Sequence, residues 1–390
     1  MKSKKPIFLT ALVTFLVTAV ILSVIFLLTV VRIVTMYRQP AYKLEQVQAL
    51  VDEYFIYDYD KDKLIEAAAA GYADALNDPY TEYLDKEEMA AMQESYSGDY
   101  VGIGVEVFID DDELITVISP FEGSPAAKAD IRPGDKIVGV EGTNVNVYNY
   151  NEAISMIKGE AGKSVKLTIK RGEAVFDVTV ERQPIVAATV KYEMLEGNIG
   201  YIHMSQFGEH TPEEFKNAIE TLKEQGATSL IVDLRNNPGG MLETLVEVAD
   251  YVLPEGDIIT VRDKQGKEER HKSDAQYEDM PMCVLINRNS ASASEAFAGA
   301  IADHGRGTLI GEKSFGKGVV QTVFELGDGT ALKLTVAKYY TPNDVCIDQI
   351  GITPHIEVAL DEEMQNMIVS NIPYEKDYQL QKAVEVLKNK

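Results

Sequence analysis

The chain has 390 residues, of which 45% are hydrophobic and 25% charged, and its net charge at pH 7 is −25. These values are typical of a globular protein with two or three domains, and they exclude a disordered chain. Residues 1–38 hold five basic and no acidic side chains, which leaves 32 basic against 62 acidic side chains in the rest. Because such an acidic body repels phosphate groups, we expect no nucleic-acid partner.

The first 40 residues form a separate compositional segment. Residues 6–31 carry no charged side chain and are rich in Leu, Val, Ile and Phe. This length crosses a hydrocarbon core of roughly 30 Å as a helix. The basic residues Lys2, Lys4 and Lys5 precede it, which favours a cytoplasmic N-terminus. We therefore expect residues 1–40 to be a single-pass anchor in the cell membrane, with the rest of the chain outside the cytoplasm.

A cleaved signal peptide is the alternative for this segment. Its apolar region would span only about 7–15 residues and end at small residues. Here the apolar run is longer, and residues 30–34 offer no such cleavage site.

Residues 41–97 have the spacing of a helical region. Apolar side chains recur every three or four residues between Leu44 and Tyr54. A second helix is expected over 61–76, a break at Asn77-Asp78-Pro79-Tyr80, and a third helix over 85–96.

From Asp99 the apolar period changes to two, and we expect a small β-domain over residues 98–184. Its helix start at Ser124-Pro125 and its turn Arg132-Pro133-Gly134-Asp135 resemble those of a bacterial, circularly permuted PDZ domain. The loop Gly102-Ile103-Gly104 would offer backbone amides to a peptide's C-terminal carboxylate, beside a strand edge that accepts an added strand. A β-rich spacer without a ligand is the alternative.

Residues 185–360 alternate between strand and helix patterns. The run 229–234 is continuously apolar, as in a buried parallel strand, and ends in the turn Arg235-Asn236-Asn237-Pro238-Gly239-Gly240. A β-hairpin is expected over 319–338, and an amphipathic helical tail over 361–390, interrupted near Pro373. The fold class is therefore α+β and multidomain: transmembrane helix, helical segment, permuted PDZ domain, α/β core and tail.

The central feature is a serine-rich corner followed by a lysine. Ser290, Ser292 and Ser294 alternate with alanine between a strand-like run and the helix-like run 295–302. A serine at such a corner projects its hydroxyl beside the unpaired amides of the helix N-terminus. A hydroxyl there needs a base, and Lys317 follows 25 residues after Ser292 in a glycine-rich loop.

Lys317 is a base only as a neutral amine, a form that burial favours by lowering a lysine pKa. Gln321, four residues later, is spaced to orient the amine. One of Gly239 and Gly240, together with the amide of Ala293, would donate to the oxyanion of a tetrahedral intermediate.

The residues alone leave two other sites open. Asp303-His304 would allow a Ser-His-Asp site, although no G-x-S-x-G elbow accompanies it. Gly311-x4-Gly316-Lys317 fits the first seven positions of a phosphate-binding loop, but Gly318 stands where Ser or Thr is needed. The two cysteines, Cys283 and Cys346, form no metal-binding pattern, so we expect no metal and no cofactor.

These motifs resemble the carboxy-terminal processing peptidases, or tail-specific proteases. The resemblance rests on Asp78-Pro79-Tyr80-Thr81-x-Tyr83, on the turn ending in Gly239-Gly240, on Asn287 to Glu295, and on Phe315-Gly316-Lys317-Gly318 with Gln321. It covers residues 42–360.

The resemblance implies a serine endopeptidase of the Ser-Lys type that takes protein C-termini through its PDZ domain. It makes Ser292 the nucleophile, Lys317 the general base and Gln321 the residue that positions Lys317, with Gly239 and Ala293 as oxyanion donors. It also implies that the PDZ domain gates the protease and that the terminal helices form a homodimer. A catalytically inactive PDZ scaffold that binds protein C-termini is the alternative.

Overall fold

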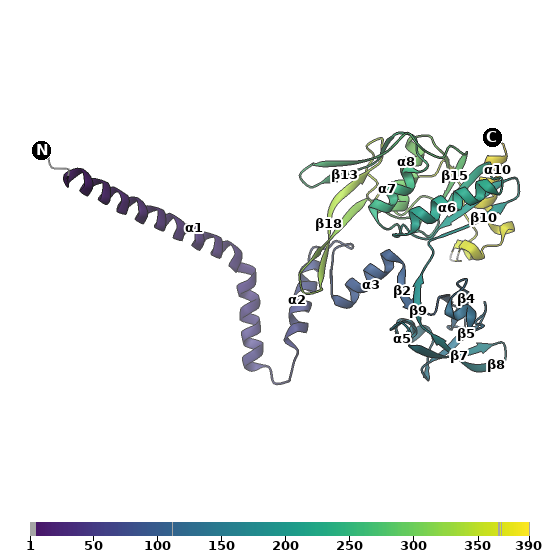
Figure 1. Cartoon of the computed structure of the whole chain (residues 1–390), viewed down its shortest axis with the longest axis horizontal. Helices are drawn as coiled ribbons and strands as arrows, with labels where there is room; N and C mark the ends of the chain where they lie inside the picture. Colours follow the sequence, from purple (N-terminus) through teal and green to yellow (C-terminus); the bar gives the residue numbers. More distant parts are fainter. Residues whose placement is uncertain (1–4, 111, 366, 368, 390) are drawn as a thin grey trace. The chain divides into compact units, whose positions relative to one another are not determined.

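The computed structural model describes residues 5–110, 112–365, 367 and 369–389, with the side chains of 5–12, 33, 35–42 and 370 left aside. The chain divides into two units, Met1–Ala68 and Ala69–Lys390. Figure 1 shows the course of the chain through its helices and strands. Lys2 and Lys4, on which the predicted membrane orientation depends, lie outside the described residues.

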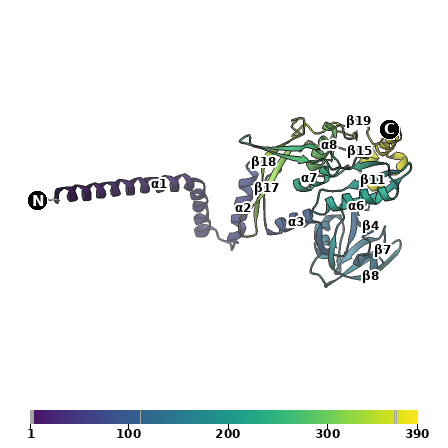
Figure 2. The same ribbon diagram turned by 45° about the horizontal axis from the view of Figure 1, so that its top comes forward.

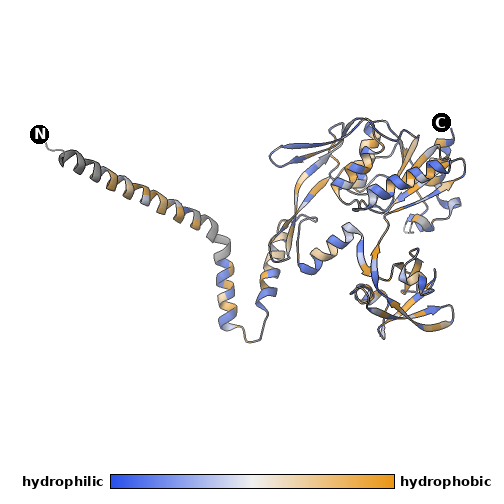
Figure 3. Ribbon diagram, viewed as in Figure 1, coloured by the Kyte–Doolittle hydropathy of each residue, from blue (hydrophilic) through white to orange (hydrophobic). Residues whose placement is uncertain are grey.

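The first unit consists of the long helix α1 (Lys5–Tyr54) and the beginning of α2 (Lys61–Asp74). The stretch Val13–Arg32 of α1 is long and apolar enough to cross a membrane, with a mean hydropathy of 2.8, and Figure 3 shows its orange colour. The turn between the two helices is held by Asp52, which accepts hydrogen bonds from Gln48, Tyr59 and Lys61.

The second unit is built around a sheet of six strands in the order β10-β11-β12-β15-β16-β19, in which only β10 runs antiparallel to its neighbour. The central strands β12 and β15 are buried at every residue, as the continuous apolar run predicted for β12. The bounds are β10 (Val190–Leu195), β11 (Ile199–Met204), β12 (Ser229–Asp233), β15 (Met282–Ile286), β16 (Thr308–Gly311) and β19 (Ile356–Glu357).

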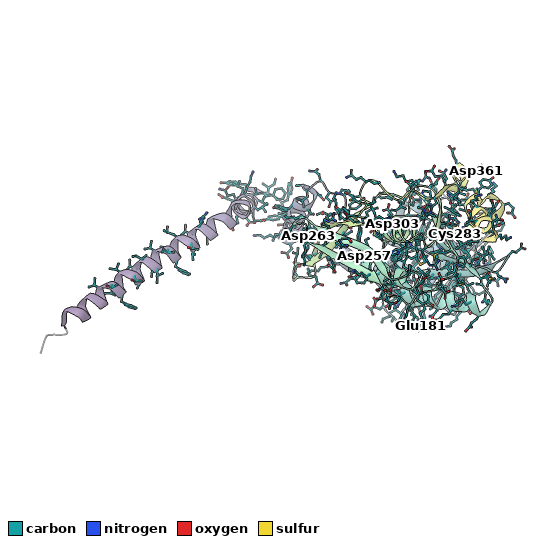
Figure 4. All side chains as sticks on the ribbon, turned by 90° about the horizontal axis from the view of Figure 1, so that it is seen from above. Glu181, Asp257, Asp263, Cys283, Asp303 and Asp361 are labelled. Carbon is teal, nitrogen blue, oxygen red and sulfur yellow. The ribbon has the colours of Figure 1, made fainter. Side chains whose placement is uncertain are left out.

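Helices cover both faces of this sheet. Leu230 and Val232 of β12 point to one face, where they pack with α6 (Thr211–Glu224), α7 (Leu242–Asp250) and α8 (Ala293–Asp303). Ile231 points to the other face and packs with Cys283 and with α10 (Tyr378–Lys388). Cys283, labelled in Figure 4, is fully buried. The alternation along β12 therefore fixes a three-layer α/β core.

A second sheet combines five strands around β18 (Ala331–Tyr340). The first half of β18 pairs with β1 (Glu82–Leu84) and its second half with β13 (Gly256–Asp263), which also pairs with β14 (Glu268–Ser273). Figure 4 labels Asp257 and Asp263, near the two ends of β13. Along its other edge β18 pairs with β17 (Val319–Glu325), and Figure 2 shows the two as a long hairpin.

The β17–β18 hairpin contains a β-bulge. Val320 pairs with Ala337, but the next residue, Gln321, pairs with Thr335, so β18 holds one extra residue, Val336.

The PDZ-like region is a sheet in the order β3-β4-β5-β7-β8, with β6 paired to β5. Its core contains Ile103, Ile137 and Leu167. The strand pair β2–β9 joins the two ends of this region. Strand β2 follows α3 and the left-handed residue Gly98, which caps that helix. The bounds are α3 (Lys86–Ser97), β2 (Asp99–Gly102), β3 (Val105–Ile109), β4 (Ile115–Pro120), α4 (Pro125–Lys128), β5 (Lys136–Val140), β6 (Thr143–Asn144), α5 (Tyr150–Ile157), β7 (Ser164–Arg171), β8 (Ala174–Glu181) and β9 (Gln183–Val186).

The described tail is interrupted around Pro373, as predicted, but it holds less helix than expected over 361–390. The short helix α9 (Glu362–Gln365) and single turns at Val369–Asn371 and Tyr374–Lys376 precede α10, which begins at Tyr378. Pro373 lacks an amide for a continuous helix, and Asp377 caps α10 by accepting a hydrogen bond from Leu380. The described tail is therefore one short helix and one longer helix joined by turns.

A buried ion network attaches this tail to the core. The Arg235 guanidinium, 1% exposed, donates to the carboxylates of Asp233 and Asp377 and to Gln379. Asp233 ends β12 and Asp377 begins α10, so one side chain connects the glycine turn after β12 to the tail.

Candidate active site

Ser292 lies at a strained corner between β15 and α8. Its φ of 56° and ψ of −115° are rare for a residue with a side chain, and it directly precedes the first helical residue, Ala293. Its exposed fraction is 7%. A strained residue between a strand and a helix is also found in the nucleophile elbow of α/β-hydrolases, but the glycine pattern of that elbow is missing here.

The two flanking serines have structural partners. Ser290 Oγ donates to the carbonyl of Leu234 at 2.8 Å, and Ser294 Oγ donates to the carbonyl of Asn237 at 3.0 Å. Both are fully buried and tie the serine corner to the segment after β12. Their hydroxyls are occupied, which leaves the middle serine as the candidate nucleophile.

The Gly239-Gly240 turn packs directly against this corner. A Cβ on Gly239 would lie 2.9 Å from the Ala293 nitrogen, and a Cβ on Gly240 would lie 2.1 Å from the carbonyl oxygen of Phe207. The Gly239 amide donates to Asn237 Oδ1 at 2.8 Å. The turn thus brings backbone amides to the serine, with the Gly239 amide held by Asn237 in this state.

The Lys317 loop is joined to the serine corner by Glu295. This carboxylate is fully buried and accepts four hydrogen bonds: from the amides of Ser292 at 2.9 Å, Gly316 at 2.6 Å and Lys317 at 2.8 Å, and from Ser314 Oγ at 2.6 Å. Sequence reasoning assigned Glu295 only to the helix start. It is the principal functional candidate that the sequence did not identify.

The Lys317 side chain is half-buried. Burial lowers its pKa, and the positive charge of Lys333 lowers it further, while the carboxylates of Glu82, Asp78 and Glu295 act in the opposite direction. Among the described residues, no hydrogen bond joins Lys317 Nζ to Ser292 Oγ. The Nζ atom lies 4.6 Å from the centre of the Tyr80 ring.

Tyr339 of β18 lines the same pocket as Ser292. Burial raises the pKa of Tyr339 to about 12, and a hydrogen bond with Ser292 opposes this rise. Tyr339 is therefore a neutral phenol that can bond the Ser292 hydroxyl in this state.

Gln321 lies on β17, where its Nε2 donates to Thr335 Oγ1 at 3.2 Å. The Thr335 amide in turn donates to Thr81 Oγ1 at 3.1 Å. Gln321 is thus linked to the Asp78–Thr81 turn that also carries the Tyr80 ring.

One pocket of about 1330 Å³ gathers these groups. Ser292, Lys317, Gln321 and Gly239 all line it, beside Tyr339. The fully buried Ala293 does not line it, although its amide lies next to Gly239. The three catalytic candidates from residues 292–321 and the glycine turn from a separate segment thus face one space large enough for an extended peptide segment.

His304 does not reach this pocket. Ser292 precedes the first residue of α8 and His304 follows its last residue, so the two lie about 18 Å apart along the helix axis. The Nε2 atom of His304 contacts the carbonyl of Asp257 at 2.8 Å. The Ser-His-Asp alternative at Asp303-His304 is therefore wrong. His271 lines another part of the pocket, 3.5 Å from Glu269.

The phosphate-loop alternative is also wrong. A phosphate loop leads from a strand into a helix, whose N-terminal amides hold the phosphates. Here the segment after Gly316-Lys317 is β17, and the Gly316 and Lys317 amides bond Glu295.

The loop Gly102-Ile103-Gly104 lies in the PDZ-like region, outside this pocket. Gly104 has a φ of 71°, and a Cβ there would lie 2.5 Å from the Ser124 Cβ. The carbonyls of Ile103 and Gly104 accept the amides of Ala126 and Phe121. The loop precedes β3, an edge strand of its sheet, as strand addition by a peptide requires.

Among the described residues, no group of three or more His, Cys, Asp or Glu side chains could hold a metal ion.

Three family models match the chain. Peptidase family S41 matches residues 198–358, a PDZ domain matches 116–171, and the N-terminal domain of the activating protease CtpB matches 33–88.

Similar proteins cover most of the chain. The carboxy-terminal processing protease CtpA of Bacillus subtilis is 38% identical over 82% of this chain and 69% of its own length. A probable CtpA-like serine protease of Staphylococcus epidermidis is 37% identical over 86% of this chain and 70% of its own. Among solved structures, the photosystem II D1 C-terminal processing protease matches with a TM-score of 0.50 and 31% identity, covering 82% of this chain and 87% of that one.

Proposed function

Because the chain belongs to peptidase family S41, together with the carboxy-terminal processing proteases, we propose that it is a serine endopeptidase with Ser292 as nucleophile and Lys317 as general base. The observation that carries this proposal is that both side chains line one pocket while Glu295 bonds the backbone of both. No other described serine combines a strained helix-start corner with such a lysine loop.

The reaction begins when the neutral Lys317 amine takes the proton of Ser292 Oγ, which attacks the substrate carbonyl carbon. The oxyanion that forms is stabilised by the amide of Ala293 and one amide of the Gly239-Gly240 turn. The Lys317 ammonium then protonates the departing amine, leaving an acyl-enzyme on Ser292. Water, deprotonated by Lys317, hydrolyses this ester and restores the serine.

Gln321 orients Lys317 during these steps. It lies four residues after the lysine and faces the same pocket. Its present partner, Thr335, leaves its side-chain oxygen free to accept a hydrogen bond from the lysine amine.

The mechanism is tested by the cleavage of an unfolded model protein with apolar C-terminal residues. We expect Ser292→Ala and Lys317→Ala each to lower the cleavage rate by at least about 10³-fold. Lys313→Ala is the matched control, because Lys313 is exposed in the same loop. Cleavage by Ser292→Ala at the wild-type rate would reject the mechanism and favour the inactive-scaffold alternative.

The PDZ domain would supply substrates by adding their C-terminal strand to β3, with the amides of Gly102, Ile103 and Gly104 facing the terminal carboxylate. Amidation of the substrate's C-terminus should then raise KM without changing kcat. The same KM for both substrates would contradict this role.

The N-terminal helix would anchor the enzyme in the cell membrane, with the catalytic body outside the cytoplasm. The length and hydropathy of Val13–Arg32 support this. A mature N-terminus beginning after Val31 would instead show that the segment is cleaved.

A homodimer through the terminal helices is consistent with the exposed apolar stripe of Leu44, Val47, Leu50 and Tyr54 on α1. Sedimentation of the full chain in detergent, compared with a Leu44→Glu, Val47→Glu variant, would test it. An unchanged sedimentation coefficient would contradict the dimer.

A further inference from the structure

The turn before β1 places an aromatic ring on the candidate general base. The Tyr80 ring centre lies 4.6 Å from Lys317 Nζ, within the range of a cation–π contact. The described ion pairs include none with Lys317, so the ring is the close partner of its charge.

The turn that carries this ring is fixed from both sides. Thr81 Oγ1 donates to Asp78 Oδ2 at 2.6 Å and accepts the Thr335 amide at 3.1 Å. Immediately after it, β1 pairs with β18 from Glu82 to Leu84. The position of Tyr80 is therefore set by the same strand that pairs with Gln321.

The carboxylates near Lys317 have other partners. Glu82 forms an ion pair with Lys333 at 2.7 Å, Asp78 bonds Thr81, and Glu295 accepts backbone amides. Asp348, the remaining charged group that faces Tyr80, forms an ion pair with Lys338 at 2.8 Å.

We propose that Tyr80 is a positioning residue that holds the Lys317 ammonium in the resting enzyme, so that the lysine must leave the ring and lose its proton to act on Ser292. This inference rests on the proposed role of Lys317 as the base. A cation–π contact stabilises the charged amine and not the neutral one. The ring therefore opposes the effect of burial on the lysine, and it sets how readily the base form appears.

The proposal predicts the direction of a pH shift. Replacing the ring by an aliphatic side chain of similar burial removes the stabilisation of the ammonium. In Tyr80→Leu the acid limb of the kcat/KM profile should move to lower pH by about 0.5–1 pH unit. Tyr80→Phe, which keeps the ring, should restore the position of the limb.

A second measurement does not depend on activity. In full-length Ser292→Ala protein in detergent, the acetylation rate of the Lys317 amine is followed against pH by peptide mass spectrometry. Adding Tyr80→Leu should lower the apparent pKa of this amine by the same amount, and adding Tyr80→Phe should not. Tyr72→Leu is the matched control, because Tyr72 is 71% exposed on α2.

The outcomes separate the two proposals. The role of the ring would be overturned if Tyr80→Leu left the apparent pKa of the Lys317 amine unchanged. It would also be overturned if Tyr80→Phe lowered that pKa as much as Tyr80→Leu does. Full activity of Lys317→Ala would overturn the proposed base, while the titration would still report whether the ring stabilises the ammonium.

Discussion

The Glu295 carboxylate accepts the backbone amide of Lys317 at 2.8 Å. Its two oxygens also hold Ser292 and the residues just before the lysine, so four donors converge on one buried charge. In Glu295→Gln the NH₂ group replaces one carboxylate oxygen. It cannot accept the hydrogen bonds of the donors that this oxygen accepts now. We expect the free energy of unfolding to fall by about 2–4 kcal/mol and the cleavage rate to fall at least about tenfold.

Chemical denaturation and a peptidase assay on the same preparation check both effects. Glu325→Gln on the exposed part of β17 is the control, since it changes the same charge without buried donors. Retention of wild-type stability and rate by Glu295→Gln would show that the carboxylate does not hold the loop.

Gly240 requires the absence of a side chain, because its added Cβ would lie 2.1 Å from the Phe207 carbonyl oxygen. Gly240→Ala should displace the turn and lower the cleavage rate by about 10²-fold or more, as the loss of one oxyanion donor does. Gly226→Ala shares the penalty of a positive φ, but its Cβ would meet no atom within 4 Å. Gly226→Ala should therefore lower stability slightly and leave kcat unchanged. Equal kcat values for the two variants would contradict the steric argument.

The pH dependence of cleavage follows from the lowered pKa of Lys317. The base is the deprotonated amine, so activity should rise with pH as the ammonium loses its proton, and the midpoint should lie below the usual lysine value of about 10.4. Lys317→Arg should be inactive at all accessible pH values, since a guanidinium keeps its proton.

The kcat/KM profile of each variant measures this effect. His304→Ala and His271→Ala are the controls, and the acid limb of their kcat/KM profiles should lie at the same pH as in the wild type. Loss of the limb in His271→Ala with activity retained in Lys317→Arg would point to a histidine base.

Asp377 balances the buried charge of Arg235. Asp377→Ala leaves that guanidinium without one of its two carboxylate partners, so the free energy of unfolding should fall by about 3–5 kcal/mol. Asp361→Ala, at an exposed position of the same tail, should change it by less than about 0.5 kcal/mol. A similar small change in both variants, measured by urea denaturation, would show that the network adds little.

The family resemblance carried by the serine and lysine motifs is confirmed by the relatives and by the matching family models. The continuous apolar run 229–234 also correctly indicated a buried parallel strand, because both faces of β12 are covered by helices. The period of the apolar residues and the spacing of the small residues are local properties, so both can be read from the sequence.

The sequence did not indicate the partners that come from distant segments. β14 reads Glu-Glu-Arg-His-Lys-Ser, which has no apolar alternation, and its strand form depends on pairing with β13. The bonds of Glu295 to residues 314–317 and the contact of Tyr80 with Lys317 arise only after folding. Such contacts between segments leave no periodic pattern in the chain.

The extra residue Val336 in β18 determines which side chain Gln321 meets. Continued in step from Val320 and Ala337, the pairing would place Gln321 opposite Val336, which has no hydroxyl to accept its hydrogen bond. The glutamine would then lose Thr335, and with it the link to the turn that carries Tyr80. The hairpin between the lysine and Tyr339 therefore has a fixed residue count: a length change of one residue would disconnect the site even though every candidate catalytic residue remained in the chain.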